Sequence, residues 1–532
     1  MNKPFLRHLI DRQVETRAAH NFLTFGEVGY SYTEMGDYSN KVANILHELG
    51  LRPNDRVAIF LPNGPDFIFC WFASIKLNIT LIPLNTQLKG EALRYIVGHA
   101  FPHLVITNAV LLKELEVVVD VLPADCRFLV VGQPETGSVL AKNLFSYEAM
   151  LTQASSERPP DLAIGEEDTA LIIYTSGTTG YPKGVMINRR AQTNHPLYYH
   201  PELIQTAPHE VAYTYLPLFH ITSQGVTMGS FVAGARLALD SEFNPFGFWE
   251  RIRRHRAVVF PYLGAVVSML YARPPQPDDA DNPARQALGA AAPRDIWAAF
   301  ERRFNLKLLE TYGQTEWLSI WVKHPLKDGI LQTRIGAAGV APARAQVKIV
   351  DEADQELPPD TPGQIIMQPA EPGLMMSGYY RQPELNQRVF KDGWYYTGDM
   401  GELDADGYLY FKGRMKDYIR RRGENISAFE IERVVNLHPA VLESAAVGVP
   451  SAISEEEVKL CLVFKPTVVA DEQPTPADLW RYCRQNLPAF MVPRYIEILS
   501  SLPHTPTQRI RKFMLAETGV VNAWDRKAAR RK

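Results

Sequence analysis

The sequence predicts an α/β protein with a large N-terminal domain and a small α+β C-terminal domain. Between about residues 30 and 130, stretches with helical spacing alternate with short apolar stretches, which is typical of a parallel sheet covered by helices. Short alternating segments with Pro and Gly turns at 334–356 and 363–367 indicate a β-rich subdomain. A helix at 428–437 and a small sheet from 445–449 and 458–464 are expected near the end.

The individual elements of the first domain follow from their spacing. The first helix has Met35, Val42 and Leu46 on one face, and the strands are short apolar runs that end at Pro, Asn or Gly. The pattern predicts helices at 32–49, 66–77, 225–233 and 294–304, strands at 56–61, 79–84, 103–107 and 128–131, and an exposed polar loop at 272–284.

Length and composition narrow the class of protein. A chain of 532 residues is too long for one hydrophobic core, so at least two domains are expected. A formal net charge of −3 gives no global attraction to nucleic acid, and the most hydrophobic stretch, 67–84, carries Lys76 and Asn78 and is expected to be core and not a membrane span. No secretory signal opens the chain, and four widely spaced cysteines indicate buried free thiols, so a cytoplasmic location is expected.

One stretch stands out as a candidate phosphate-binding loop. An apolar strand predicted at 170–173 leads into Tyr174-Thr175-Ser176-Gly177-Thr178-Thr179-Gly180-Tyr181-Pro182-Lys183-Gly184. The glycines allow close backbone approach, the hydroxyls supply hydrogen-bond donors, and Lys183 supplies a positive charge. It is not the G-x-x-x-x-G-K-[ST] loop, because no hydroxyl residue follows the lysine. The alternative is a solvated Gly/Thr turn between strands.

Two later motifs have a chemistry that suits a nucleotide. In Glu310-Thr311-Tyr312-Gly313-Gln314-Thr315-Glu316, the Tyr312 ring can stack on a purine and Thr315 can donate to a phosphate. The carboxylate of Glu316 can hold Mg²⁺ between phosphate oxygens. In Thr397-Gly398-Asp399, a carboxylate can accept two hydrogen bonds, as a ribose diol requires.

In these motifs, and in their order and spacing, the chain resembles the adenylate-forming superfamily of acyl-CoA synthetases, peptide-synthetase adenylation domains and beetle luciferases. These enzymes join a carboxylate to AMP and pass the acyl group to an acceptor, usually a thiol. The resemblance covers nearly the whole chain. It implies ATP or AMP, Mg²⁺ and coenzyme A as cofactors, and a carboxylic acid or its acyl-adenylate as substrate. It also implies an AMP-binding domain at 1–413 and a mobile domain at 414–532, with a hinge near Lys416.

The resemblance also implies roles for individual residues. The nucleotide is expected to contact the loop residues Thr175, Ser176, Gly177, Thr178, Thr179, Gly180 and Lys183, the turn Gly289, Ala290 and Ala291, and Tyr312, Gly313, Thr315, Glu316, Asp399 and Arg414. The acyl pocket is expected to be bounded by His220, Tyr262, Gly264, Gly289 and Trp317. After domain rotation, Arg422 and Gly423 are expected to line the path of the thiol, with the basic run 420–422 meeting CoA phosphates or forming a solvated patch.

One position departs from the family pattern. The last motif of the family carries a lysine that bridges the substrate carboxylate and the α-phosphate during adenylation, and here that place is taken by Arg509. A planar guanidinium does not replace a compact ammonium between two oxyanions, so acyl-AMP formation is expected to be weak while transfer to CoA is preserved. A separate adenylating enzyme is then expected as a partner. The alternatives are that Arg509 still works or that Lys512 substitutes for it; in an extended segment Lys512 would lie on the opposite face.

The sequence therefore predicts an acyl-CoA ligase. Attack of a thiolate on a mixed anhydride needs no covalent enzyme intermediate, so no cysteine is expected to act as nucleophile. Two alternatives stay open: a stand-alone adenylation enzyme that loads a carrier protein, and a non-catalytic protein that binds acyl-AMP or nucleotide. Small residues at 289–292 favour a medium-length or bulky apolar acid over acetate.

Overall fold

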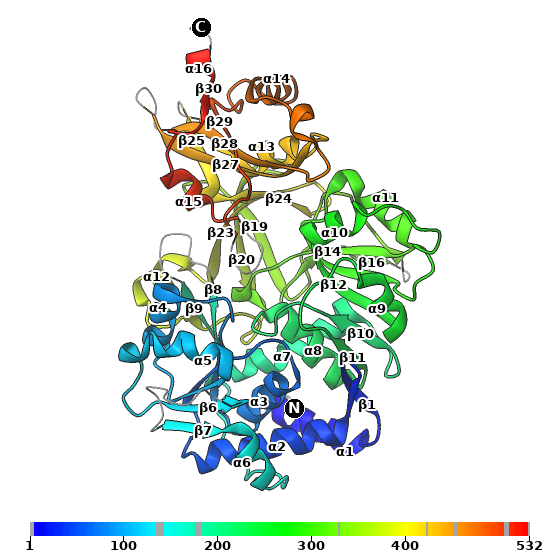
Figure 1. Ribbon diagram of the computed structural model, residues 1–532, viewed down its shortest axis with the longest axis vertical. Helices are drawn as coiled ribbons and strands as arrows, with labels where there is room; N and C mark the ends of the chain where they lie inside the picture. The colour runs from blue at the N-terminus through cyan, green and yellow to red at the C-terminus, as the bar shows by residue number, and fades with distance from the viewer. Residues whose placement is uncertain are drawn as a thin grey trace. The chain divides into compact units, whose positions relative to one another are not determined.

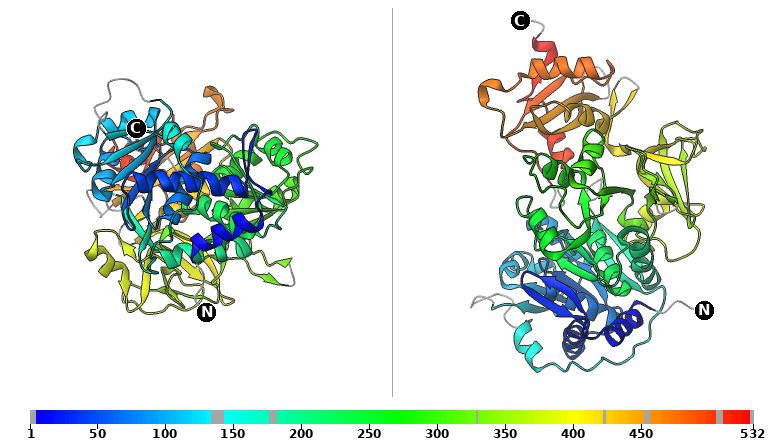
Figure 2. Two further views of the ribbon diagram at one scale, coloured as in Figure 1. Left: turned by 90° about the horizontal axis from the view of Figure 1, so that it is seen from below. Right: turned by 90° about the vertical axis from the view of Figure 1, so that its right-hand side faces the viewer.

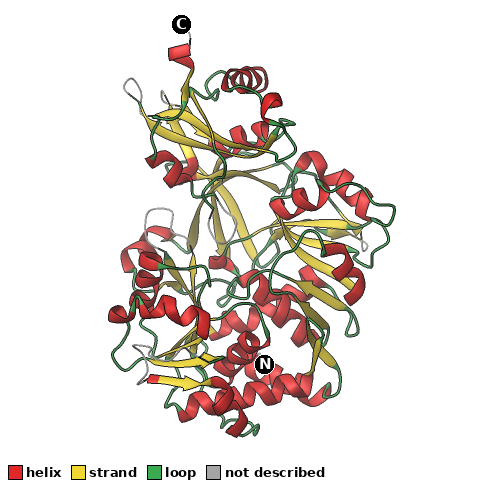
Figure 3. Cartoon of the chain, in the orientation of Figure 1, coloured by secondary structure: helices red, strands yellow, loops and turns green. Residues whose placement is uncertain are grey.

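The computed structural model describes residues 5–133, 143–175, 182–327, 330–421, 424–451, 456–504 and 510–529. Its contacts group into two units, Met1–Gln346 with Gln368–Gly393 and Val347–Met367 with Trp394–Lys532. The predicted mixed α/β class, with a large N-terminal and a small C-terminal part, is confirmed (Figure 3). The predicted hinge near Lys416 lies inside the second unit and stays a prediction.

The first unit contains an eight-stranded, mostly parallel sheet (Figure 1). The antiparallel pair formed by β8 and β9 is the exception that matters here, because it brackets the candidate loop. In spatial order the strands are β21 (Gly378–Tyr379), β9 (Lys183–Asn188), β8 (Thr169–Thr175), β4 (Thr80–Pro83), β3 (Arg56–Phe60), β5 (Leu104–Asn108), β6 (Arg127–Val131) and β7 (Leu144–Ser146).

Helices cover both faces of this sheet because its strands alternate apolar side chains between the two faces. On one face, α4 and α5 bury Leu93, Val97 and Leu115 against Phe60 and Val105. The helices α1 and α2 pack side by side (Figure 2), and Ser31 begins α2 with a capping box that includes Glu34. The bounds are α1 (Leu6–Thr16), α2 (Tyr32–Glu48), α3 (Pro65–Lys76), α4 (Gly90–Ala100), α5 (Ala109–Glu116), the 3-10 turn Val119–Val121 and α6 (Tyr147–Gln153).

A second sheet of the first unit carries the motif at 310–316, which begins on β14, and the predicted adenine turn, which follows β13. From β14 to β1 in the order below, each strand is parallel to the next. The order is β18 (Gly339–Val340), β15 (Val322–Lys323), β14 (Lys307–Tyr312), β13 (Gln286–Ala290), β12 (Ala257–Leu263), β10 (Val211–Thr214), β11 (Arg236–Leu239), β1 (Asn21–Phe25) and β2 (Val28–Ser31).

The helices of this region pack large aromatic side chains on the second sheet. Phe248, Trp297, Phe300 and Phe304 form one buried cluster with Phe260 of β12. The elements are α7 (Arg189–Tyr199), the π-helical turn His200–Ile204, α8 (Ile221–Ala233), α9 (Phe248–His255), α10 (Gly264–Tyr271), α11 (Arg294–Phe304), the 3-10 turn η4 (Thr315–Trp317) and α12 (Pro383–Val389), with short strands β16 (Leu326–Lys327), β17 (Ile330–Leu331) and β22 (Phe390–Lys391).

The second unit combines antiparallel hairpins with a small α+β sheet in the order β27-β28-β29-β30. Gly407 turns the β23–β24 hairpin with a left-handed φ of 80°, which glycine adopts at low cost. The elements are β19 (Ala345–Val350), β20 (Gly363–Pro369), β23 (Trp394–Leu403), β24 (Tyr408–Arg414), η5 (Met415–Asp417), β25 (Tyr418–Arg421), β26 (Glu424–Ser427), α13 (Ala428–Val435), β27 (Val441–Pro450), β28 (Glu456–Phe464), the 3-10 turn Ala470–Glu472, α14 (Pro476–Asn486), β29 (Tyr495–Ile498), α15 (Lys512–Glu517), β30 (Trp524–Asp525) and α16 (Arg526–Ala529).

Most predicted elements are confirmed, and the loop predicted at 272–284 is mostly exposed. The predicted exposed loop at 272–284 has no helix or strand, but Asp279 and Ala284 are buried. The carboxylate of Asp279 lies 2.7 Å from the guanidinium of Arg303, which draws the loop onto α11. The four cysteines are free and buried as predicted, and burial raises the pKa of Cys461 to about 11. No helix among the described residues is long and apolar enough to cross a membrane.

Candidate active site

The antiparallel β8–β9 pair holds the two ends of the candidate loop together. Thr175 ends β8, Lys183 begins β9, and the two are register partners. The residues between them that were expected to bind phosphate, Ser176, Gly177, Thr178, Thr179 and Gly180, lie outside the described residues. The described ends therefore place a lysine and a threonine at the carboxyl end of β8, where α/β sheets bind ligands.

The loop and the second motif meet at Tyr379, a residue that the sequence reasoning missed. The phenol oxygen of Tyr379 donates a hydrogen bond of 2.9 Å to Oε1 of Glu316. The ammonium of Lys183 lies 5.2 Å from the centroid of the same ring, within cation–π distance. Lys183 and Glu316, far apart in the sequence, thus contact one aromatic side chain.

Glu316 is suited to a magnesium ion that arrives with a nucleotide. It follows Thr315 in the η4 turn, and its side chain is mostly buried. The described residues contain no cluster of three or more His, Cys, Asp and Glu side chains that could hold a metal ion. Mg²⁺ in phosphate-transfer sites needs only one or two protein carboxylates, since phosphate oxygens and water supply the rest. One carboxylate beside a lysine fits that requirement.

The predicted adenine turn is held by Glu310, a second residue whose role the sequence reasoning missed. Its carboxylate accepts hydrogen bonds from the amides of Ala291, at 2.5 Å, and Ala292, at 3.1 Å, and from the phenol of Tyr262, at 2.5 Å. Ala291 has a φ of 64°, a left-handed conformation that a residue with a Cβ adopts only when its surroundings enforce it. Glu310 supplies that enforcement from the neighbouring strand, where it is the register partner of Gly289.

Burial sets the protonation of this carboxylate. It raises the pKa of Glu310 to about 7, although the donors from Tyr262, Ala292 and Ala291 and the charge of Arg294 lower it. Burial also raises the pKa of Tyr262 well above its ordinary value, and the charge of Glu310 adds to this effect. Glu310 therefore changes charge near neutral pH at the turn that was expected to face adenine.

Two glycines of the expected acyl pocket are required for strand packing. A Cβ on Gly264 would come within 2.0 Å of the carbonyl oxygen of Ala291, and one on Gly289 within 2.1 Å of the carbonyl oxygen of Tyr262. These missing side chains accommodate neighbouring backbone. Tyr262 belongs to the buried aromatic cluster of the second sheet and hydrogen-bonds Glu310, and Ala290 ends β13.

The remaining aromatic candidates come together in pairs. Tyr312 packs edge-on against the fully buried Trp317, with ring centroids 5.0 Å apart, and Gly313 follows Tyr312. His220 is half-buried, precedes α8 and packs on Phe219 at 4.6 Å. His195 bridges these segments, because its ring nitrogens lie 2.6 Å from the carbonyl oxygen of Leu318 and 3.4 Å from that of Ile221.

The candidate ribose residues belong to the second unit. Asp399 and Arg414 are register partners on β23 and β24, and the guanidinium lies 3.4 Å from the carboxylate. The amide of Asp399 donates to the Thr397 hydroxyl, so the backbone of the motif is fixed locally. Lys416 lies in the 3-10 turn η5. Arg422, Gly423 and Arg509 lie outside the described residues.

Arg421 is directed into the second unit, and its predicted contact with CoA phosphates is corrected. Its guanidinium lies 2.8 Å from the fully buried Glu457 and donates to the carbonyl oxygens of Phe490 and Val492. The Arg494 guanidinium lies 3.8 Å from the other carboxylate oxygen of Glu457. Among the described residues, neither carboxylate oxygen of Glu457 accepts a well-aligned hydrogen bond, so the two guanidinium groups stabilise it through their charge. Arg421 therefore anchors β25 to the small sheet.

Lys512 also forms its ion pairs within the second unit. It begins α15, so the extended arrangement considered for it is absent at this position. Its ammonium lies 2.7 Å from Glu432 and 3.8 Å from Asp417, next to the predicted hinge. Burial raises the pKa of Glu432, whereas Lys512 and the amide of Ala446 lower it.

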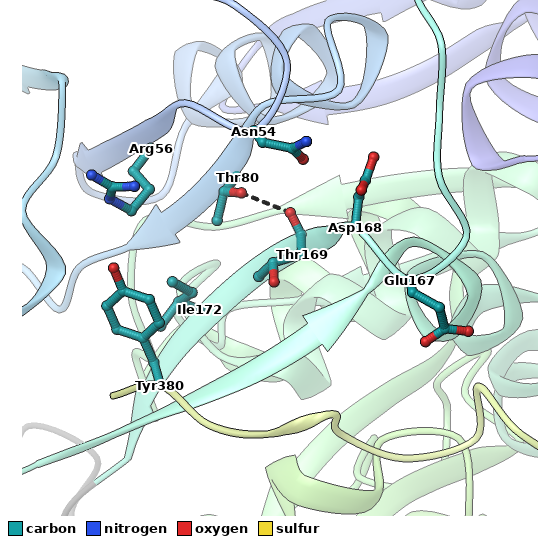
Figure 4. Close-up of a pocket in the computed structure, with 8 residues that line it drawn as sticks. All are labelled: Asn54, Arg56, Thr80, Glu167, Asp168, Thr169, Ile172 and Tyr380. Carbon is teal, nitrogen blue, oxygen red and sulfur yellow. Dashed lines mark hydrogen bonds between the residues drawn. The ribbon is translucent and has the colours of Figure 1, made fainter. Parts of the chain in front are cut away.

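A cavity of about 320 Å³ in the first unit is lined mostly by residues at the amino ends of strands, although the amide of its Tyr380 donates to the carbonyl oxygen of Gly184 in the loop motif (Figure 4). It is lined by Arg56, Thr80 and Thr169, the first residues of β3, β4 and β8, together with Tyr380. Its position at the amino ends of the parallel strands is opposite to the end that ligands occupy in α/β sheets. The cavity therefore does not identify the active site.

Comparisons with known proteins place the chain in context. The family model described as "AMP-binding enzyme" matches residues 10–380, and that described as "AMP-binding enzyme C-terminal domain" matches 430–509. Crotonobetaine/carnitine–CoA ligase of Salmonella paratyphi B is 31% identical over 498 residues, which cover 91% of this chain and 92% of that protein. The ligase of the same name from Escherichia fergusonii is 30% identical over 90% of this chain and 92% of its own length.

Solved structures share the fold. An anthranilate CoA ligase in complex with anthranoyl-AMP superposes with a TM-score of 0.84 at 22% identity, covering 97% of each chain. A benzoate CoA ligase from Burkholderia xenovorans has a TM-score of 0.83 at 22% identity, covering 97% of this chain and 100% of that one. At these identities the likeness is one of architecture.

Proposed function

The chain belongs to the AMP-binding enzyme family, and from this premise we propose that it is an acid–CoA ligase that works through an acyl-adenylate. In the first half-reaction, a substrate carboxylate attacks the α-phosphorus of ATP and pyrophosphate leaves. In the second, the CoA thiolate attacks the acyl carbon and AMP leaves. The two bonds broken are a phosphoanhydride and a mixed anhydride, so no covalent enzyme intermediate is needed.

The observation that carries this proposal is the meeting of Lys183 and Glu316 at Tyr379. Phosphoryl chemistry depends on fixed positive charge around the phosphates and on exact placement, more than on covalent groups of the protein. Lys183 places its charge on the phosphates. Glu316 would hold Mg²⁺, which neutralises phosphate charge when bound.

We propose the remaining contacts to the nucleotide from the family resemblance. Tyr312 stacks on adenine against the turn that Glu310 holds. The carboxylate of Asp399 accepts hydrogen bonds from the ribose hydroxyls, and the guanidinium of Arg414 forms an ion pair with that carboxylate. Lys416 serves as the hinge, and Arg422 with Gly423 lines the entry of the thiol.

The finer part of the proposal is that adenylation is the weak half-reaction. Arg509 stands where the family resemblance implies a lysine. The ion pair of Lys512 with Glu432 supports this, because that lysine already neutralises carboxylates of its own unit. The enzyme then works mainly on preformed acyl-AMP, supplied by an enzyme that condenses the acid with ATP.

The test is to incubate the purified protein with synthetic acyl-AMP and either CoA or a holo-carrier protein, and to measure transfer of the acyl group. The proposal predicts acyl-CoA and AMP in equal amounts, with little transfer to the carrier. Transfer to the carrier alone would identify a carrier-loading enzyme. Intact acyl-AMP with both acceptors would identify a binding protein.

The acid is best found with a panel of acyl-adenylates. The relatives named above act on crotonobetaine and carnitine, so quaternary ammonium acids belong in the panel beside apolar acids longer than acetate. Turnover is compared as kcat/KM, since that ratio measures discrimination between substrates. We propose an acid larger than acetate, and acetate as the best substrate would contradict this.

A further inference from the structure

Tyr379 occupies a fixed position between two groups of the candidate active site. It is 3% exposed, and its phenol donates to Glu316 while its ring lies beneath Lys183. It makes these contacts with different parts of one side chain, the hydroxyl and the π-face. The two contacts can therefore be removed separately by substitution.

The backbone of Tyr379 is held on both sides. Its amide donates to Oδ1 of Asn386 at 2.7 Å, and Nδ2 of Asn386 donates to its carbonyl oxygen at 3.1 Å. On β21, Tyr379 is the register partner of Val185 on β9, the strand that begins with Lys183. A side chain that is buried, on a strand and clamped by an amide has little freedom to move.

The carboxylate that receives the phenol is fixed from its own side as well. The carbonyl oxygen of Glu316 accepts the amide of Met376 at 2.7 Å, three residues before Tyr379. The segment 376–379 thus contacts Glu316 through both main chain and side chain. Because one oxygen is held by the phenol, the carboxylate presents a set direction to an approaching cation.

We propose that Tyr379 is a positioning residue that orients the Glu316 carboxylate toward nucleotide-bound Mg²⁺ and holds Lys183 ready for the phosphates. The inference rests on the proposed function, since it assumes that ATP binds here with magnesium. According to this inference, the hydroxyl of Tyr379 contributes to ATP binding only when Mg²⁺ is present, whereas its ring contributes with and without Mg²⁺.

Calorimetric titration of ATP, with and without Mg²⁺ and with no acid present, tests this division. Wild-type protein is expected to bind ATP more tightly with Mg²⁺. Tyr379→Phe keeps the ring, so its ATP affinity without Mg²⁺ is expected to stay unchanged. The increase in ATP affinity that Mg²⁺ causes is expected to be about tenfold smaller than in the wild type, because one hydrogen bond to a charged group is lost. Tyr379→Leu loses the ring too and is expected to weaken binding in both conditions.

Three further variants make the result specific: Tyr380→Phe, Glu316→Gln, and Glu316→Gln combined with Tyr379→Phe. Tyr380→Phe is the matched control, because it removes the adjacent phenol, which lines the cavity of Figure 4. The substitution is expected to leave the ATP affinity unchanged both with and without Mg²⁺. In a Glu316→Gln background, Tyr379→Phe is expected to have no further effect on the magnesium gain, since the carboxylate it orients is gone. Circular dichroism checks that each variant is folded.

The outcomes separate this inference from the proposed function. An unchanged magnesium gain in Tyr379→Phe, or full additivity with Glu316→Gln, overturns the role of Tyr379 and leaves the proposed function standing. Absence of ATP binding by wild-type protein in either condition overturns this inference, and the proposed function is then decided by acyl transfer from synthetic acyl-AMP to CoA. Coupling of Tyr379 with Glu316, together with an added loss in Tyr379→Leu, supports the inference.

Discussion

The ammonium of Lys512 lies 2.7 Å from a carboxylate oxygen of Glu432, so this lysine has a partner within the C-terminal unit. The same carboxylate oxygen accepts the amide of Ala446, and Asp417 lies 3.8 Å from the ammonium. The contacts join the start of α15 to α13 and to the turn that contains the predicted hinge. Lys512 is therefore a structural cation of this unit.

Replacing Lys512 should lower stability more than it lowers catalysis. Lys512→Gln leaves a largely buried carboxylate without its cation, so a loss of about 1–3 kcal/mol is expected in denaturant unfolding of the C-terminal unit. Lys527→Gln, at an exposed lysine, should change it by less than about 0.5 kcal/mol. Abolition of wild-type pyrophosphate exchange by Lys512→Gln, in protein that stays folded, would instead identify Lys512 as the adenylation lysine.

Removing Arg421 should be costly because it leaves Glu457 buried. Arg421→Met is expected to destabilise the second unit by about 3 kcal/mol, since the remaining cation, Arg494, is 3.8 Å away. The double variant Arg421→Met with Glu457→Met should be more stable than the single one, because no uncompensated charge remains. Urea unfolding measures both. Equal stability of the two variants would show that Glu457 does not need Arg421.

Glu310 should make stability depend on pH in a defined direction. Its folded pKa of about 7 lies above its unfolded value, so the folded protein binds the extra proton between about pH 4.5 and 7. The stability that this proton contributes is complete below the unfolded pKa and is lost as pH rises to 7. The melting temperature of wild type minus that of Glu310→Gln should therefore be higher at pH 5 than at pH 8. A difference that is constant with pH, or reversed, would contradict the assignment.

Gly264 should not tolerate a side chain. A Cβ there would meet the Ala291 carbonyl oxygen at 2.0 Å and push the turn away from Glu310. Gly264→Ala is expected to cost more than about 2 kcal/mol and to weaken AMP binding. Gly64→Ala is the control, because Gly64 is extended, with a φ of 172°, and has nothing within 4 Å of its Cβ position. Thermal unfolding and AMP titration compare the two, and wild-type behaviour of Gly264→Ala would show that the turn has room.

Local pattern was enough to predict much of the fold. The helix at Arg294–Phe304 was predicted to the residue, because small residues precede it and apolar residues recur at helical spacing. The loop at 272–284 is mostly exposed, as its polar composition predicts, whereas the burial of Asp279 against Arg303 of another element follows from no local pattern. Such partners are set by tertiary packing and leave no mark in the local composition.

The site residues that lie in sequence motifs could be predicted. The residues that hold those motifs in place through tertiary contacts could not. Glu310 is part of a motif, yet its role depends on its contact with Ala291, which follows the neighbouring strand. Tyr379 lies in a two-residue strand that no pattern marked. For Arg421 a signal existed, because alternation along a strand separates it from its two arginine neighbours.

Carboxylate-dependent exchange of pyrophosphate into ATP, measured beside acyl transfer from acyl-AMP to CoA, tests the central claim most directly. The account predicts brisk acyl transfer but weak exchange in the wild type. In Arg509→Lys, exchange should rise on the order of 10²-fold while acyl transfer stays unchanged, because the lysine acts only in adenylation. Robust exchange in the wild type, or no gain in Arg509→Lys, would contradict it.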